Sequence, residues 1–555
     1  MIAGQVIARL RSQLWSAGLC AVLVATLSLA SAAPHAVTTN AAGEALYRFG
    51  RLAADQPLRG ERESGVHVEG ADAACVNCHR RSGLGAVEGR SFIPPITGQF
   101  LFHPKLKNPE DLDLPYIEGA RVNREPYTDE TLARAIRKGI GVDGRALSYL
   151  MPRYAIDDDS MRSLIEYLRQ LTAKNVPGVS DSTLQLATII TPDADPLKRQ
   201  GMLAVLNEYF AEKNATTRAV SPTMRRYRKM MFRAQRRWQL HVWELTGSAA
   251  TWEAQLHRRL AAEPVFAVIS GLGGKDWAPI HHFCEQSALP CLFPNIELPV
   301  LGENDFHSLY LSKGVLLEAG LIASQLRERP AEPGLRRLIQ VYRGNDVGAA
   351  AAAALDAATD GSGLKTLHRV IKAGTAARSE LAAALKGVGL ADVLVLWLRP
   401  ADIAALGALA PASSAIFMSG QMAGLENAPL PPAWRMTTRL AYPYDLPDLR
   451  RVRVDYPLGW FTIRHIPIVD LQVQADTYLA CGLLSETLNH LADTFVRDYL
   501  IERIELMLER RVITGYYPRL SLAQGQRFAS KGGYVVRFKN PSGAQIIPAS
   551  DWIIP

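Results

Sequence analysis

Cysteine is scarce in this chain, with six among 555 residues. This count excludes a small scaffold held together by many disulfides. Hydrophobic residues make up 48% and charged residues 21% of the sequence, which is ordinary for globular proteins and excludes a disordered or fibrous chain. A single hydrophobic core stops growing at roughly 250–300 residues, so we expect several folding units.

The chain also lacks a concentrated charge of one sign. The net charge is +8, from 62 basic and 54 acidic residues. The one dense basic run, Met224–Trp238, is interpreted as a solvated helix face or loop, with docking to an acidic partner as the alternative. Nucleic-acid binders carry a basic stripe, so no nucleic-acid partner is predicted. The sequence contains no G-x-S-x-G, H-E-x-x-H or P-loop motif.

Only the N-terminus carries a long apolar run. Arg9 and Arg11 precede an apolar stretch at 19–29, and the small residues Ala30-Ser31-Ala32 follow it. This pattern predicts a secretory signal peptide over residues 1–32, with an uncleaved anchor as the competing interpretation. The run is too short for an ordinary spanning helix, and no second one follows, so no stable membrane span is expected. We therefore predict a periplasmic protein in an oxidising compartment.

The remaining chain divides into two parts. A first unit is expected at 43–171, and a linker at 172–183 contains the Pro, Gly and Ser typical of a boundary. From 184 to 555, short apolar runs alternate with helical patterns, which predicts βαβ units with parallel sheets in two lobes. Strands are expected at 184–190, 240–245, 266–270, 338–342, 365–371 and 393–398, and helices at 195–212, 251–262, 277–287, 347–358 and 376–385.

The strongest motif is Cys75-Val-Asn-Cys78-His79, a C-x-x-C-H sequence. This spacing is typical of covalent haem c attachment, in which both thiols add to the haem vinyl groups and the histidine ligates the iron. The alternatives are a redox dithiol and a zinc half-site. A redox pair would sit within a βαβ pattern, and zinc would need further ligands. One covalent haem c is therefore predicted.

A six-coordinate haem needs a second axial ligand, commonly a methionine thioether. Met161 follows an acidic N-cap cluster and is expected inside a helix. Met151 precedes Pro152 in an expected loop, so we predict that Met151 is the iron ligand. The alternatives are His67 and His103, and a packing role for Met151.

Residues 43–171 resemble a class I c-type cytochrome. The resemblance is carried by Gly43–Tyr47 and Thr128–Gly139, by Met151-Pro152, by Leu164–Leu168 and by Pro94. It implies an all-α cytochrome c domain in which the Pro94 carbonyl accepts the ring N–H of His79. The segment 100–127 is longer than in the smallest members. The resemblance implies single-electron transfer with a redox partner protein, for example an exported dehydrogenase.

Residues 184–555 resemble a type I periplasmic binding protein of the branched-chain amino-acid class, a two-lobed α/β fold. The resemblance is carried by the segments Val265–Gly274, Cys284–Pro294 and Leu338–Gly348. Such folds bind a small molecule between two lobes. Because ligands of open α/β sheets lie beyond the carboxyl ends of strands, candidate contacts follow the expected strand at 266–270. They are Ser270, Gly271, Gly273 and Gly274, whose N–H groups could hold an anion, with a plain tight turn as the alternative.

The other cysteines fall in this second part. Cys284 and Cys291 are seven residues apart in an exported domain, which favours a disulfide. Cys481 is expected to pack as a small buried hydrophobe, with pairing to either of the others left open. His281-His282 are adjacent and would point apart on a helix, which disfavours a metal site there.

The functional hypothesis is an exported mono-haem cytochrome, not an enzyme, that transfers single electrons and carries a C-terminal domain for a small-molecule ligand. The alternative is a periplasmic ligand sensor or solute receptor whose haem reports redox state. An enzyme acting in the interlobe cleft is the least favoured hypothesis.

Overall fold

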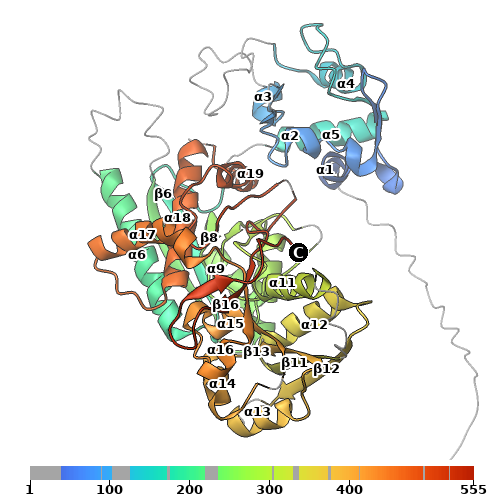
Figure 1. Ribbon diagram of the computed structural model, residues 1–555. Coiled ribbons are helices and arrows are strands. Elements are labelled where there is room, and N and C mark those ends of the chain that lie inside the picture. The colour runs from blue at the N-terminus through green and yellow to red at the C-terminus, as the bar shows by residue number, and fades with distance from the viewer. Residues whose placement is uncertain are drawn as a thin grey trace, which may run out of the picture.

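The protein consists of an N-terminal unit and a larger two-lobed body (Figure 1). The computed structural model describes residues 39–88, 91–102, 125–171, 176–218, 236–302, 305–328, 337–372, 377–411, 413–491, 494–523 and 525–555. The predicted signal peptide at 1–32 lies outside these ranges. Among the described helices, none is long and apolar enough to cross a membrane.

The N-terminal unit is built on helices α1 (Thr39–Phe49), α2 (Val76–His79), α3 (Gly98–Phe102), α4 (Asp129–Lys138) and α5 (Asp158–Gln170). Helix α1 packs against α5, where the rings of Tyr47 and Tyr167 lie 5.3 Å apart. The helix ends follow from the sequence: Thr128 caps α4 by accepting the Thr131 N–H, and Gly139 ends it in the left-handed region at φ +67°.

The expectation that this unit is all-α is wrong in detail. A small antiparallel sheet has the order β2-β1-β5, from β1 (Arg59–Glu61), β2 (His67–Glu69) and β5 (Arg153–Ala155). Strands β3 (Ala86–Glu88) and β4 (Ser91–Ile93) form a second antiparallel pair. These strands have three residues each, too few for their alternation to be distinguished from loop in the sequence.

The first lobe contains a parallel sheet of order β10-β9-β8-β6-β7. Its strands are β6 (Thr183–Ile190), β7 (Arg237–Glu244), β8 (Ala267–Ile269), β9 (Cys291–Leu292) and β10 (Ser308–Leu309). Helices α6 (Pro196–Arg218), α9 (Trp252–Ala262) and α10 (Ala278–Gln286) connect them. The predicted alternation of strands and helices is confirmed here.

The second lobe contains a seven-stranded sheet of order β12-β11-β13-β14-β15-β16-β17. The strands β11 (Arg337–Arg343), β12 (Lys365–Ile371), β13 (Asp392–Trp397), β14 (Ala415–Ser419) and β15 (Thr438–Tyr442) are parallel, and β16 (Tyr534–Phe538) and β17 (Ile546–Pro548) are antiparallel. Every residue of β13 is buried, as expected for a strand covered on both faces. Its helices include α11 (Val315–Glu328), α12 (Gly348–Thr359), α13 (Ala377–Leu385) and α15 (Gly420–Ala423).

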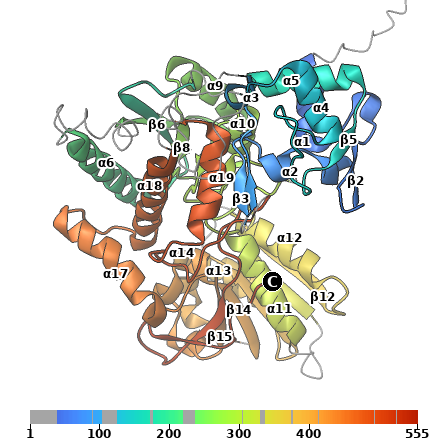
Figure 2. The ribbon, with the colours of Figure 1, turned by 90° about the horizontal axis from the view of Figure 1, so that it is seen from above.

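The chain returns to the first lobe after β15. Helix α17 (Pro447–Ile463) leads to α18 (Leu471–Leu491), which packs on α6, and α19 (Arg497–Leu508) packs on α18. The chain then rejoins the second sheet at β16. Figure 2 shows α19 beside β3 and α2 of the N-terminal unit.

Cys284 on α10 and Cys291 on β9 do not form the expected disulfide in this structure. Both are free thiols, fully enclosed in an apolar cluster, and burial next to Cys291 raises the pKa of the Cys284 thiol. Their proximity keeps the disulfide a prediction for the exported protein. Cys481 on α18 is completely buried, which confirms its expected packing role.

Candidate functional site

An apolar slot of about 430 Å³ lies inside the N-terminal unit. The five residues singled out for haem binding all line it: Cys75, Cys78, His79, Pro94 and Met151. The rest of its wall is mainly apolar and includes Leu101, Leu132, Ile136, Leu147, Ile156, Leu164 and Leu168. The fold thus brings two thiols, an imidazole and a thioether from two separate segments to one apolar cavity.

The helical turn of α2 holds the attachment motif. The His79 N–H donates to the Cys75 carbonyl at 3.0 Å, which places these neighbours on one turn. His79 Nδ1 lies 3.0 Å from the Pro94 carbonyl oxygen. A carbonyl only accepts, so Nδ1 is the donor and Nε2 keeps its lone pair. Burial lowers the pKa of His79 more than the bond to Pro94 raises it, which favours the neutral, ligating form.

Met151 lies in a loop that contacts the slot, as the sequence predicts for its local structure. Its N–H donates to the Ser148 carbonyl at 3.1 Å, and the Arg153 guanidinium donates to its carbonyl. The alternative thioether, Met161, is buried in the core beside α1 and α4. His67 is exposed on β2, and His103 lies outside the described residues. Of the candidates that the structure describes, Met151 is the one that lines the slot with His79.

The loop after His79 docks on α19 of the two-lobed body. Ser82 donates from its backbone N–H and its Oγ to the Glu502 carboxyl at 2.8 and 2.6 Å. Arg80 pairs with Glu505 at 2.8 Å, and Glu505 also pairs with Arg527 at 2.7 Å. Burial raises the pKa of Glu502 to about 8, so this carboxyl is mostly protonated at neutral pH.

Asp498 extends the same interface by one helical turn. It lies 3.2 Å from Arg81 and 3.6 Å from Arg48 of the N-terminal unit. On its other side it lies 3.1 Å from His307 Nε2 of the first lobe. Asp498, Glu502 and Glu505 therefore form a buried acidic face of α19 that orients the N-terminal unit on the body.

A second cavity, of about 500 Å³, lies between the two lobes. Its wall comes from segments that follow parallel strands: Asp193 after β6, Gly273 and Gly274 after β8, Glu297 after β9, and Arg399 after β13. Residues after β14 and β15 and from α18 complete it. This is the edge at which open α/β sheets bind ligands.

The loop that contains Ser270, Gly271, Gly273 and Gly274 differs from the anion-binding loop that the sequence analysis considers. Gly273 and Gly274 line the cleft, whereas Ser270 and Gly271 do not. The Gly274 N–H donates to Thr191 Oγ1, and the N–H groups of 270 and 273 donate to carbonyl oxygens. A Cβ at Gly271 or Gly273 would approach the Trp277 ring to 2.6 Å, so these glycines permit close packing. The tight-turn alternative describes the loop better.

The sequence analysis did not identify the charged side chains that line the cleft. Arg399 makes two bonds to Glu297 across the lobes, at 2.9 and 2.6 Å, and pairs with Asp346 at 2.7 Å. Arg399 directly follows the strand predicted at 393–398, so the rule that ligands lie beyond strand ends could have found it. Asp476 comes from the helix α18, where no such signal exists.

Asp476 is the buried acid of the cleft. Burial raises its pKa to about 8, and nearby Asp470 adds to the effect. Tyr517 donates to its Oδ2 at 3.4 Å, while its Oδ1 has no hydrogen-bond partner among the described residues. A buried acceptor without a partner is costly, so a ligand that donates to Asp476 would gain binding energy.

Of three comparisons with known proteins, the one with solved structures found matches. No protein-family model matches the sequence, and no curated protein matches it. Among solved structures, a fatty acid ABC transporter substrate-binding protein from Thermomonospora curvata is 17% identical, with a TM-score of 0.47 over 69% of this chain and 95% of its own. A possible leucine/isoleucine/valine-binding protein from Rhodopirellula baltica is 14% identical, with a TM-score of 0.48 over 68% and 98%. A branched chain amino acid ABC transporter from Thermus thermophilus with bound valine is 10% identical, with a TM-score of 0.45 over 68% and 98%. Each score is below 0.5, so the two-lobed α/β assignment rests on the strand order.

Proposed function

We propose that this chain is an exported receptor for a small molecule and that its N-terminal unit carries one covalently attached haem c. The observation that carries the proposal is the combination of two cavities in one molecule. One brings Cys75, Cys78, His79 and Met151 together, and the other lies at the strand ends between two lobes. The interface on α19 joins them.

The donor set and the apolar lining of the slot fit a haem. Cys75 and Cys78 would hold it through thioethers, and His79 Nε2 and the Met151 sulfur would be the axial ligands. When bound, the group supplies reversible single-electron transfer, and an apolar site with a thioether ligand favours the reduced state. Pro94 fixes the orientation of the His79 ring, and the apolar wall excludes water.

The cleft favours a ligand with a protonated amine. Asp193, Asp195, Glu297 and Asp476 face it, against Lys198 and Arg399. An ammonium group could donate to Asp476 Oδ1, and a carboxylate of the same ligand could contact Lys198. Amino acids meet this description. The valine-bound neighbour makes L-valine a suitable first probe.

Electron transfer as the main activity is the second candidate function. It is favoured by one observation, the presence of both an imidazole and a thioether in the slot, which would leave no open iron position for substrate. An exported dehydrogenase would be the class of partner. In this alternative the cleft would bind that partner's product or an effector.

A redox titration of the purified holoprotein, with and without an amino-acid library, tests the proposal. A receptor whose haem reports redox state requires a library member that binds and shifts the midpoint potential. A plain carrier would show a reversible potential that no compound changes. Failure to attach haem when the chain is exported with the c-type maturation machinery would refute both.

Two matched variants test the assignment of the iron ligand. Met151→Leu removes the thioether in the slot, and Met161→Leu makes the same change in the core of the same unit. We expect loss of the methionine–iron charge-transfer band in the first variant and its retention in the second. Retention in both would exclude Met151. Export itself is tested by N-terminal sequencing of the periplasmic fraction, where cleavage after Ala32 is expected.

A further inference from the structure

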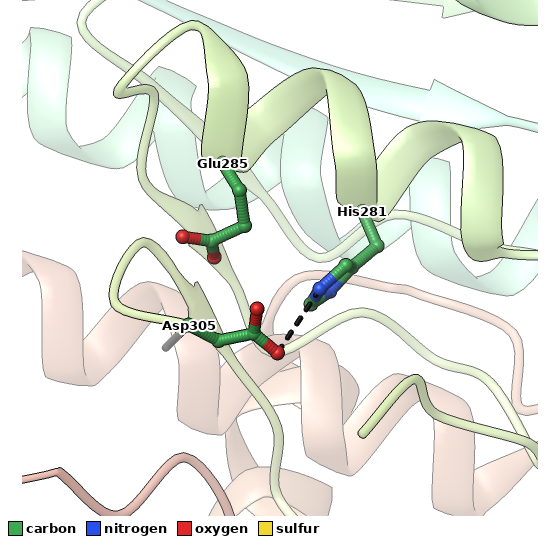
Figure 3. A group of neighbouring side chains, drawn as sticks. All are labelled: His281, Glu285 and Asp305. Atoms are coloured by element: carbon green, nitrogen blue, oxygen red, sulfur yellow. Dashed lines mark ion pairs between the residues drawn. The ribbon is translucent and has the colours of Figure 1, made fainter. Parts of the chain in front are cut away.

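Three side chains of the first lobe converge at a point that the proposed function does not use. His281 and Glu285 lie one turn apart on α10, and Asp305 faces them from the segment before β10 (Figure 3). The imidazole and carboxylate ligand atoms of the three residues all lie within 4.8 Å of one another. His281 Nε2 is 3.1 Å from Asp305 Oδ2.

The other nitrogen of His281 is held by a buried tyrosine. His281 Nδ1 lies 2.8 Å from Tyr310 Oη, and the His281 ring is almost completely buried. When Nδ1–H donates to Tyr310 Oη, Nε2 presents its lone pair to the two carboxylates. Metal-ligating histidines use this arrangement, in which a second hydrogen bond fixes the tautomer and the ring orientation.

A second histidine supplies independent support. The His307 side chain is 1% exposed, and its Nε2 lies 3.1 Å from Asp498 Oδ1. Its Nδ1 has no hydrogen-bond partner within the described part of the chain and lies 3.5 Å from Glu285 Oε2. A buried ring nitrogen without a partner is costly. His307 is held by Asp498 through one ring nitrogen and faces Glu285 with the other, so it helps to position the Glu285 carboxylate.

The charge of the cluster is unbalanced. Glu285 accepts N–H bonds from residues 306, 307 and 308, at 2.9, 3.1 and 2.7 Å. Three bonds leave about one of the four acceptor positions of this carboxylate. Asp305 adds a second carboxylate, and within the described residues its ion pair is with His281.

We propose that His281, Glu285 and Asp305 form a binding site for a divalent transition-metal ion, in which His307 positions the Glu285 carboxylate. Imidazole and carboxylate ligands suit zinc and its neighbours better than magnesium or calcium, which prefer oxygen alone. The ion would neutralise the carboxylates and fasten the segment before β10 to α10. The adjacent His282 is exposed and takes no part.

Zinc binding to the full-length holoprotein tests the site, because haem attachment removes Cys75 and Cys78 as competing ligands. Equilibrium dialysis against Zn²⁺ followed by elemental analysis should give one zinc per chain in addition to iron. We expect His281→Ala and Asp305→Asn each to weaken zinc binding at least 100-fold. The matched control His282→Ala, one residue away on the same helix, should bind zinc as the unsubstituted protein does.

Two results would overturn the proposal. One is the absence of stoichiometric zinc in the unsubstituted protein, which would make His281 and Asp305 a structural ion pair only. The other is equal zinc binding by His281→Ala, Asp305→Asn and His282→Ala. Circular dichroism establishes that each variant is folded. Should His281→Ala fail to fold, Asp305→Asn decides, since it keeps the shape of the side chain.

Discussion

The buried Glu502 carboxyl gives the sharpest test of how the N-terminal unit is held. Its side chain accepts two hydrogen bonds from Ser82 and is 3% exposed. Burial raises its pKa from 4.5 to about 8. In Glu502→Gln, the amide oxygen can accept the Ser82 N–H and the amide nitrogen can donate to Ser82 Oγ. The variant therefore mimics the protonated carboxyl and does not titrate.

The sign of the pH dependence follows from proton linkage. Between pH 4.5 and 8 the unfolded chain has released the Glu502 proton and the native chain retains it. Stability is therefore lost as the pH rises through this window, by up to about 1.4 kcal/mol per pH unit. From pH 6 to 8 the unsubstituted protein should lose roughly 2–3 kcal/mol of unfolding free energy relative to Glu502→Gln. Above pH 8 the difference should level off.

Urea unfolding followed by circular dichroism at pH 6, 7, 8 and 9 measures this difference. The control is Glu509→Gln, at an exposed position just beyond the same helix, which should show no such trend. A difference between Glu502→Gln and the unsubstituted protein that stays constant from pH 6 to 9 would refute the reasoning. It would mean that Glu502 is ionised at neutral pH and that Arg80 compensates its burial. Glu502→Ala should cost about 1–3 kcal/mol because Ser82 keeps a buried donor without an acceptor.

Three further predictions concern the two-lobed body. Because the ionised form of Asp476 pairs with an ammonium group, the affinity for L-valine measured by calorimetry should rise as the pH increases from 6 to 8. The variant Asp476→Asn should show no such rise. The same rise in the variant as in the unsubstituted protein would exclude Asp476 as the group that binds the ammonium. After export, Cys284 and Cys291 should form a disulfide worth about 2–3 kcal/mol; alkylation of both thiols in the denatured, unreduced protein would contradict it. Leu394→Ala, at a completely buried position of β13, should cost about 2–5 kcal/mol in urea unfolding, and a loss below about 1 kcal/mol would argue against a close-packed sheet.

The strands of the body could be predicted from sequence because their apolar runs are nearly continuous. The expected strand at 393–398 is observed as Asp392–Trp397, and the one at 365–371 has the same bounds in the structure. Local pattern and tertiary burial agree in these segments. The short strands β8 and β9 pair over only two residues, so their register depends on the neighbouring strands.

The candidate sites also differ in how far a local sequence pattern predicts them. The residues predicted to bind haem follow from a local motif and a loop methionine, and all of them line one slot. The cleft depends on contacts that no local pattern contains: Glu297 and Arg399 are 102 positions apart and meet across the lobes. His281 was set aside because adjacent histidines diverge on a helix. That argument holds for His282, but it says nothing about the carboxylates that the fold brings to His281.

Helix α19 shows why an acidic helix face is hard to interpret from sequence. Asp498, Glu502 and Glu505 are spaced to share one face, and such a face is usually solvated. Here that face is buried against the loop that follows His79, and each acid contacts a residue of the N-terminal unit. The same helix packs on α18, which carries Asp476 into the cleft. The slot and the cleft are therefore joined by two packed helices, and a ligand that moved α18 would act through α19 on the loop next to His79.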